Sequence, residues 1–294
     1  MQARRRPATA HTSTTVGEVR RVLEEAYPPH LAESWDAVGL ICGDPDDSVT
    51  KVAFALDCTQ SVAEQAVASG AQMLVVHHPL LLRGVTSVAA DTPKGKVIHT
   101  LIKGGVALFA AHTNADKARP GVNDKLAQLV GIEPGRPVVP HERFDGEVPA
   151  DALGLGRIGE LPEPLTLREF TQQVANALPE TAWGIRAAGD PEGVVKRVAV
   201  SSGSGDSFLD TARELGVDVY VTSDLRHHPV DEHLRAGGPA VIDTAHWASE
   251  FPWTSQARDI VVEALKVDTE IIELRTDPWT ISAHGENHEQ PKEN

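Results

Sequence analysis

The stretch Met73-Leu74-Val75-Val76-His77-His78-Pro79 is the part of the chain around which the other elements are arranged. Four apolar residues in a row predict a short buried strand, and Pro79 favours an end to that strand just after the two histidines. Open α/β sheets bind their ligands at the carboxyl ends of strands, so this histidine pair marks a candidate site. On this stretch alone two interpretations stay open: a metal site, or two solvent-facing histidines in a turn.

The segments around this strand predict a parallel sheet. A strand, a helix and a second strand in succession form a βαβ unit, which implies a right-handed crossover and parallel strands. The elements that we expect are a strand over 52–56, a helix over 61–69, the strand at Met73, a helix over 95–103, a strand over 106–111 and a helix over 122–130. The strand over 106–111 runs into His112-Thr113-Asn114-Ala115-Asp116, so polar residues again follow a strand.

The second half of the chain repeats this pattern. The matching strand segments, at the same spacing in both halves, are 51–53 with 197–199 and 73–75 with 219–221. Further on, His112-x-x-x-Asp116 matches His246-x-x-x-Glu250, and each follows an apolar strand. Two matches in the same chain order favour a duplicated α/β half.

These patterns predict the α/β fold class, with two similar, pseudo-duplicated domains whose mixed sheets are flanked by helices. We expect the first domain over 16–134, where Thr15 and Glu18 form a capping box for its first helix. The second domain is expected over 165–281. Residues 135–164 are rich in proline and glycine, which indicates an irregular linker. The ends of the chain, 1–15 and 282–294, are expected to be a flexible tail and a disordered tail.

The composition is that of an acidic globular protein. Hydrophobic residues make up 41% of the chain and charged residues 23%, and the formal net charge is −15. This charge argues against nucleic acid and anionic membranes as partners, and no apolar run has the length of a membrane span. The two cysteines, Cys42 and Cys58, are too few for a disulfide framework, so we expect a cytoplasmic protein.

Five side chains near the predicted strand ends form a candidate set of metal ligands. They are His77, His78, Asp116, His246 and Glu250. Three imidazoles and two carboxylates suit Zn²⁺, Mn²⁺ or Fe²⁺, whereas Ca²⁺ prefers oxygen ligands alone. Five ligands exceed what one open tetrahedral site needs, and they fit two metal ions that share a carboxylate. Two such ions would leave the site positively charged, so that it would attract phosphate or carboxylate groups.

His246 and Glu250 also have a simpler interpretation as ordinary helix surface. Their i, i+4 spacing places an imidazole and a carboxylate one turn apart on the same helix face. That spacing suits a metal site, and it equally suits a surface pair worth a few tenths of a kcal/mol. Taken singly, the surface pair is the better interpretation. Taken with the further ligands at other strand ends of a duplicated fold, the metal site is better.

Several motifs together resemble a known family. In chain order they are Trp35-Asp36-Ala37-Val38-Gly39-Leu40, His77-His78-Pro79-Leu80, His112-Thr113-Asn114-Ala115-Asp116, Asp243-Thr244-Ala245-His246-Trp247-Ala248-Ser249-Glu250 and Thr276-Asp277-Pro278-Trp279. Over residues 16–281 the chain is similar to the dinuclear metal-centre proteins. These are also called GTP cyclohydrolase 1 type 2 homologues or NGG-interacting-factor-like proteins.

The resemblance implies a site and an assembly. It implies two divalent metal ions per subunit at the interface of two α/β domains, in a ring-shaped homohexamer that encloses a cavity. The five side chains above would be the ligands, with His77 and His78 on separate ions and Glu250 as the bridge. Thr222-Ser223-Asp224 departs from the family's usual threonine-glycine-glutamate, which leaves the role of its aspartate open. The segment 135–164 is too short for the large domain that some members insert there.

Other features carry weaker predictions. His112 is expected to support a metal ligand or to act as a general base, and the pair His227-His228 to line the same cavity. The amides of the loop 201–206 could cradle an anion. Because that loop lacks a third glycine and a Walker lysine, a tight turn between strand and helix is the better interpretation. Trp35 is expected to fill the core.

The leading hypothesis is a metal-dependent hydrolase. A metal-activated water would attack an electrophilic carbon or phosphorus of a small anionic substrate such as a nucleotide. The family resemblance suggests ring opening of GTP, although no residue of the sequence identifies guanine. The alternative is a metal-handling protein, such as a metallochaperone, or a regulatory protein that binds divalent ions without turnover. Both hypotheses predict the same five ligands.

Overall fold

Short runs of β-branched and other apolar residues form the strands of two separate sheets, one in each of two units. The computed structural model describes residues 14–283, so the two predicted tails lie mostly outside the described residues. One unit consists of residues 14–115 with Thr254–Leu274, and the other of Asp116–Trp253 with residues 275–283. Among the described residues, no helix is both long and apolar enough to cross a membrane.

The first unit is built on a five-stranded mixed sheet in the order β1-β4-β3-β2-β12. Its strands are β1 (Gly39–Cys42), β2 (Lys51–Ala55), β3 (Met73–Val76), β4 (Ala107–Ala110) and β12 (Asp268–Ile271). Strands β4, β3, β2 and β12 are parallel, and β1 runs antiparallel to β4. The predicted βαβ unit around Met73 is therefore confirmed.

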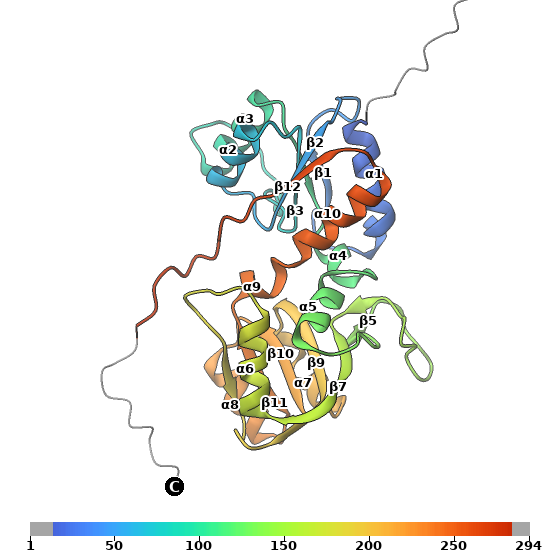
Figure 1. Ribbon diagram of the computed structural model, residues 1–294, viewed down its shortest axis with the longest axis vertical. Helices are drawn as coiled ribbons and strands as arrows, with labels where there is room; N and C mark the ends of the chain where they lie inside the picture. Colours follow the sequence, from blue (N-terminus) through green and yellow to red (C-terminus); the bar gives the residue numbers. More distant parts are fainter. Residues whose placement is uncertain (1–13, 284–294) are drawn as a thin grey trace, which may run out of the picture. The chain divides into compact units, whose positions relative to one another are not determined.

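Helices cover both faces of this sheet (Figure 1). They are α1 (Val16–Ala26), η1 (Pro29–Leu31), α2 (Gln60–Ala68), α3 (Pro93–Lys103), α4 (Thr113–Lys117) and α10 (Trp253–Ala264). Thr15 and Glu18 form the predicted capping box of α1. The apolar faces of α2 and α3 pack on strand residues such as Leu74 and Leu108, and α1 and α10 lie beside the opposite face. Within α4 the chain passes from the first unit to the second.

The second unit is built on a mixed sheet in the order β7-β9-β10-β11-β8. Its strands are β7 (Arg157–Thr166), β8 (Arg186–Ala188), β9 (Val194–Ser204), β10 (Val219–Ser223) and β11 (Ala240–Thr244). Strands β9, β10 and β11 are parallel, and the outer strands β7 and β8 are antiparallel to their neighbours. A small antiparallel pair, β5 (Val139–Pro140) and β6 (Gly154–Leu155), precedes this sheet in the chain.

Helices flank this sheet as well. They are α5 (Val122–Val130), α6 (Leu167–Ala177), η2 (Asp206–Phe208), α7 (Leu209–Glu214), α8 (His227–Arg235) and α9 (His246–Glu250). Leu209 and Ala212 of α7 pack with Tyr220 and Val241 of the sheet. Both units thus contain three consecutive parallel strands with a short antiparallel strand beside the last of them, which agrees with the predicted duplication of an α/β half.

The segment 135–164 differs from the expected linker. Its last residues form β7, which pairs with β9 and buries Ile158 and Leu161 in the second unit. Its prolines 162 and 164 lie where the register between the two strands shifts, between Glu160 and Leu165. An irregular register tolerates residues that lack an amide hydrogen. The prolines therefore suggested a linker where the chain forms an edge strand.

The boundaries of the two units also differ from the expected domains at 16–134 and 165–281. Helix α5 belongs to the second unit, where the buried Arg157 forms a two-pronged ion pair with Asp124 of that helix at 2.8 Å. The final strand β12 returns to the first unit, because its residues pair with β2 from Asp268 to Ile271.

Candidate metal centre

In the first unit, polar side chains follow three neighbouring parallel strands. Asp57 comes after β2, His77 and His78 follow β3 directly, and His112 follows β4. The backbone amides of His77 and His78 both donate to the carbonyl oxygen of Leu56, at 3.1 and 3.0 Å, where β2 ends. Because the carboxyl ends of parallel strands lie at one edge, this register gathers these side chains at the place where α/β folds bind ligands.

Three imidazoles lie together at this edge. The ring centroids of His77 and His78 are 5.0 Å apart, and those of His112 lie 5.1 Å from His77 and 5.6 Å from His78. One ring nitrogen from each histidine lies within 4.8 Å of those of the other two, a grouping able to hold a metal ion. His77 is fully buried, so its ring is fixed by packing.

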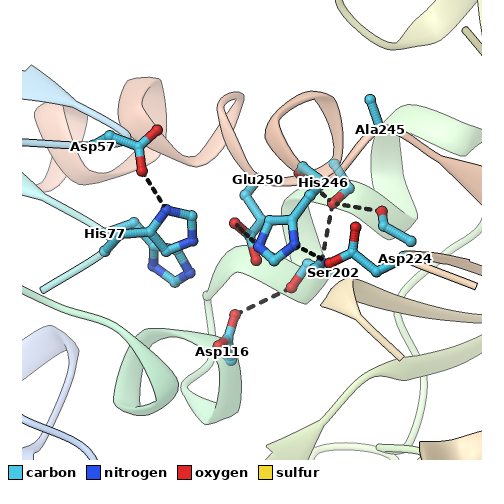
Figure 2. A network of polar contacts seen from close by, with 12 residues as sticks. Asp57, His77, Asp116, Ser202, Asp224, Ala245, His246 and Glu250 are labelled. Carbon is cyan, nitrogen blue, oxygen red and sulfur yellow. Dashed lines mark hydrogen bonds and ion pairs between the residues drawn. The ribbon is translucent and has the colours of Figure 1, made fainter. Parts of the chain in front are cut away.

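Each of these rings is oriented by an oxygen atom at its Nδ1. The Nδ1 of His77 lies 2.8 Å from the carbonyl oxygen of Ala111. That of His78 lies 2.7 Å from Oδ1 of Asp57, whose contact Figure 2 marks with a dashed line. The Nδ1 of His112 lies 2.9 Å from Oδ1 of Asp36. A neutral ring that donates from Nδ1 carries its lone pair on Nε2, and metal-binding histidines are typically oriented in this way.

The position of Asp36 follows from the antiparallel strand β1. Gly39, the first residue of β1, pairs with Ala110 at the end of β4, so the residues just before β1 arrive beside His112. The carboxylate of Asp36 is fully buried and accepts hydrogen bonds from His112 and from the amide and hydroxyl of Thr113. Burial raises the pKa of Asp36, but these hydrogen bonds outweigh it and hold the pKa far below its usual range.

In the second unit, α9 brings His246 and Glu250 together. The Nε2 of His246 lies 3.1 Å from Oε2 of Glu250, whose side chain is almost completely buried. The charge of Glu250 raises the pKa of His246 to about 11, against the opposing effect of burial. The two side chains form an ion pair when the imidazole is protonated. A divalent ion competes for the same two ligand atoms, since metal binding to histidine displaces the proton.

Asp224 orients His246 from the end of β10. Its Oδ2 lies 2.6 Å from Nδ1 of His246, which leaves Nε2 as the ligand atom (Figure 2). Asp224 has a φ of 58°, in the left-handed region that non-glycine residues seldom adopt. The strained backbone thus coincides with the contact to His246, and such strain clusters at binding sites. The family departure at Thr222-Ser223-Asp224 therefore still provides a carboxylate at this histidine.

Gly203 lies directly beside the side chains of Glu250 and His246. A Cβ at Gly203 would lie 2.3 Å from Oε1 of Glu250 and 3.2 Å from Nε2 of His246, and φ here is +62°. Only glycine leaves room for the carboxylate at this point. Residues 201–204 form the end of β9, and Gly205 alone separates them from η2. The strand therefore passes into the helix by a tight turn, as the missing Walker lysine indicated.

Asp116 is held in the second unit by Ser202, near the end of β9. Its Oδ1 accepts a hydrogen bond of 3.1 Å from the hydroxyl of Ser202, whose amide donates to Asn123 at 2.8 Å (Figure 2). The side-chain amide of Asn123 in turn donates to the carbonyl oxygen of Asp116 at 3.0 Å. These contacts fix the carboxylate at the start of the second unit.

The predicted residues thus fall into two sets, each described within its own unit. The first unit brings together His77 and His78 and adds His112. The second unit pairs His246 with Glu250 and holds Asp116 at Ser202. Imidazole nitrogens and carboxylate oxygens are suitable donors for Zn²⁺, Mn²⁺ or Fe²⁺, so the residues present fit the expected metals chemically.

The pair His227-His228 lies elsewhere in the second unit, exposed at the start of α8. His227 lines a cavity of about 350 Å³ with Arg186 and Arg226, and neither histidine belongs to a grouping able to hold a metal among the described residues. Three residues at the two sets, Asp36, Asp57 and Gly203, were not predicted for these roles. The only sequence indication for them was their place at strand ends and in the tryptophan-aspartate motif.

Comparisons with known proteins agree on one family. The Duf34/NIF3 (NGG1p interacting factor 3) family matches residues 14–278. A Streptomyces coelicolor protein named GTP cyclohydrolase 1 type 2 homolog is 49% identical over 271 residues, which cover 90% of this chain and 93% of the relative. A protein of the same name from Mycobacterium tuberculosis is 40% identical over 371 residues, which cover 92% of this chain and 97% of the relative.

Solved structures have the same fold. A hypothetical protein from Staphylococcus aureus superposes with a TM-score of 0.80 at 29% identity, over 92% of this chain and all of the other. A Bacillus cereus protein related to NIF3 superposes with a TM-score of 0.81 at 24% identity, over 91% of this chain and 99% of the other. The match in sequence over nearly the whole chain shows that this protein belongs to the Duf34/NIF3 family.

Proposed function

We propose that this protein is a metal-dependent hydrolase with a dinuclear centre, and that its ligands are His77, His78, Asp116, His246 and Glu250. The observation that carries the proposal is the orientation of the imidazoles. The three rings of the first unit and His246 of the second each meet an oxygen atom at Nδ1. In metal-binding histidines the ring nitrogen that does not bind the metal almost always donates a hydrogen bond, whereas structural histidines have no such requirement.

The course of the chain supports one shared centre for the two sets. Asp116 follows His112 by four residues, and both lie at or next to the short helix α4, in which the chain passes from one unit to the other. The carboxylates of Asp116 and Glu250 would supply the oxygen ligands that the imidazole set of the first unit lacks. Divalent ions held by these five side chains would supply Lewis acidity and positive charge.

His112 is the residue that we propose for proton transfer. Its Nδ1 is held by the ionised Asp36, which steadies a neutral ring with the lone pair on Nε2 and stabilises the charged ring once a proton arrives. Its side chain is 17% exposed, so its ring can meet a substrate or water molecule. His112 would therefore accept a proton from the attacking water while the other two imidazoles of the first unit stay ligands.

The substrate that we propose is a small phosphate-bearing molecule, a nucleotide such as GTP. Two divalent ions with two carboxylate ligands would carry positive charge inside a protein of net charge −15, so the ions themselves would hold an anion that the rest of the surface repels. The relatives named GTP cyclohydrolase 1 type 2 homolog suggest guanine nucleotides as the first compounds to assay.

Metal-loaded protein tested against a panel of nucleoside triphosphates checks this proposal. His77→Ala is expected to lose bound metal and turnover together. His112→Ala is expected to keep its metal and lose turnover by about a hundredfold or more, the usual contribution of a general base. His99→Ala, on helix α3, is the matched control and should behave as the wild type. A metal-loaded wild type without turnover on the panel would favour the alternative, a protein that binds or carries divalent ions.

We further propose, from the family resemblance, a ring-shaped homohexamer in the cytoplasm. Exposed apolar side chains such as Ile102 and Val194 are available for contacts between copies. Light scattering after size exclusion is expected to give six times the chain mass of 31.5 kDa. A stable monomer at micromolar concentration would contradict this assembly.

A further inference from the structure

Trp35 lies on the surface beside the histidines of the first unit. It is 58% exposed, so the expectation that it fills the core is wrong. Its indole lies 6.0 Å from the ring of His112, centroid to centroid, with 77° between the two planes. An edge contact of this kind covers less of an aromatic ring than stacking does. A large aromatic surface is therefore open to solvent one ring away from the candidate metal centre.

The backbone on both sides of Trp35 is fixed. The amide of Asp36 donates to the carbonyl oxygen of Glu33 at 3.0 Å, and the amide of Glu33 donates to the hydroxyl of Thr113 at 2.9 Å. The buried carboxylate of Asp36 also accepts from the amide of Ala37 at 2.8 Å. Trp35 thus stands between anchored residues, so little backbone freedom would be lost if a ligand packed against it.

The same aspartate positions both rings. Asp36 holds His112 through its carboxylate and fixes Trp35 through the peptide bond that joins them. The backbone of Trp35 is therefore held close to the histidine group, which suits recognition of two parts of one molecule. A ligand that matches this pair of features has a flat ring at one end and a strongly anionic group at the other.

We propose that Trp35 is a stacking platform for the base of a nucleotide whose phosphates bind at the metal centre. The inference rests on the proposed function, because it takes the phosphate-binding centre as given. An exposed aromatic face stacks on any nucleobase, and the anionic end of a nucleotide suits divalent ions. Trp35 thereby selects nucleotides over phosphate compounds that lack a ring, without selecting among bases.

Binding of two probes to the metal-loaded full chain tests the inference. The probes are GTP and inorganic tripolyphosphate, which has the phosphates and no ring, and isothermal calorimetry gives both dissociation constants. Trp35→Ala is expected to weaken GTP binding by about ten- to a hundredfold, the range found for loss of one base-stacking side chain. Binding of tripolyphosphate should not change. Trp35→Phe should restore most of the affinity for GTP.

Trp279→Ala is the matched control, since Trp279 is also 58% exposed and lies in the other unit. Metal content, measured on every variant, shows whether the centre is intact. Equal weakening of both probes in Trp35→Ala, or no weakening of GTP, would overturn the stacking platform and leave the proposed function standing. Failure of both probes to bind the metal-loaded wild type would overturn the proposed function itself, and the platform with it.

Discussion

At the scale of single residues, the candidate centre depends on carboxylates that are not among the five proposed ligands. Asp57 and Asp224 meet the Nδ1 atoms of His78 and His246, at 2.7 and 2.6 Å. Asp57 is 21 residues from its histidine and Asp224 is 22 residues from His246, so no local spacing rule indicates either pair. The histidines could be predicted as ligand candidates from their place after strands. Their supporting carboxylates could not, because the fold alone brings them together.

Gly203→Ala is expected to abolish metal binding by His246 and Glu250. The new Cβ would lie 2.3 Å from Oε1 of Glu250 and force the carboxylate away. Gly216→Ala is a close control, because Gly216 has a φ of +61° and no atom lies within 4 Å of the place that its Cβ would take. Both variants should lose about 1 kcal/mol or more of stability from the left-handed backbone. Only Gly203→Ala should lose bound metal, which elemental analysis measures. Equal metal content in the two variants would contradict this account of Glu250.

Asp224→Asn is expected to weaken metal binding while the fold is kept. Asparagine tolerates the left-handed φ of 58°, but it no longer supplies a negative charge to Nδ1 of His246. Loss of such a supporting carboxylate typically costs about ten- to a hundredfold in metal affinity. Competition with a chromogenic chelator measures the change, and Asp231→Asn on helix α8 serves as the control. An unchanged affinity would show that Asp224 has no part in orienting the ring.

At the scale of elements, buried parallel strands were the easiest to predict. The strands β3 and β10 read as continuous apolar or β-branched runs because both faces of each sheet are covered by helices. The edge strands were harder. The three residues of β8 are largely exposed and leave no hydrophobic pattern, and β7 contains two prolines at its register shift. Edges need less burial than the centre of a sheet, so their sequences are less constrained.

An ion pair between β2 and β12 helps to hold the last strand in the first sheet. Lys51 of β2 and Glu270 of β12 lie 2.5 Å apart, each with 27% of its side chain exposed. The hydrogen bond from Lys51 lowers the pKa of Glu270, against a smaller opposing effect of burial. A lowered carboxyl pKa stabilises the fold above the unfolded pKa of about 4.3, and this stability is lost as the pH falls below it.

Glu270→Gln should therefore reduce stability only while the wild-type glutamate is ionised. The loss near pH 7 should be about 1 kcal/mol or less, since the pair is partly exposed and screened by solvent. Urea unfolding at several pH values is the measurement, and the difference from the wild type should shrink below about pH 4. Glu273→Gln, at an exposed position, is the control. A difference that grows in acid would contradict the assigned direction of the pKa shift.

At the scale of the whole molecule, polar residues follow parallel strands in both units. His77 follows β3, and Asp224 follows the equivalent strand β10. The family could be predicted from five motifs in order. The extents of the units could not, because the chain returns to the first unit after Trp253 and only strand pairing reveals this return. The shared dinuclear centre stays a prediction.

The most direct test of that centre is the number of metal ions per chain. Full-length protein is stripped with a chelator, reloaded with Zn²⁺, Mn²⁺ or Fe²⁺ and dialysed, and its metal is measured by plasma mass spectrometry. The proposal predicts about two ions per chain in the wild type, and a loss of both in Glu250→Ala because that carboxylate would be shared. Fewer than one ion per chain in the reloaded wild type would contradict the dinuclear centre.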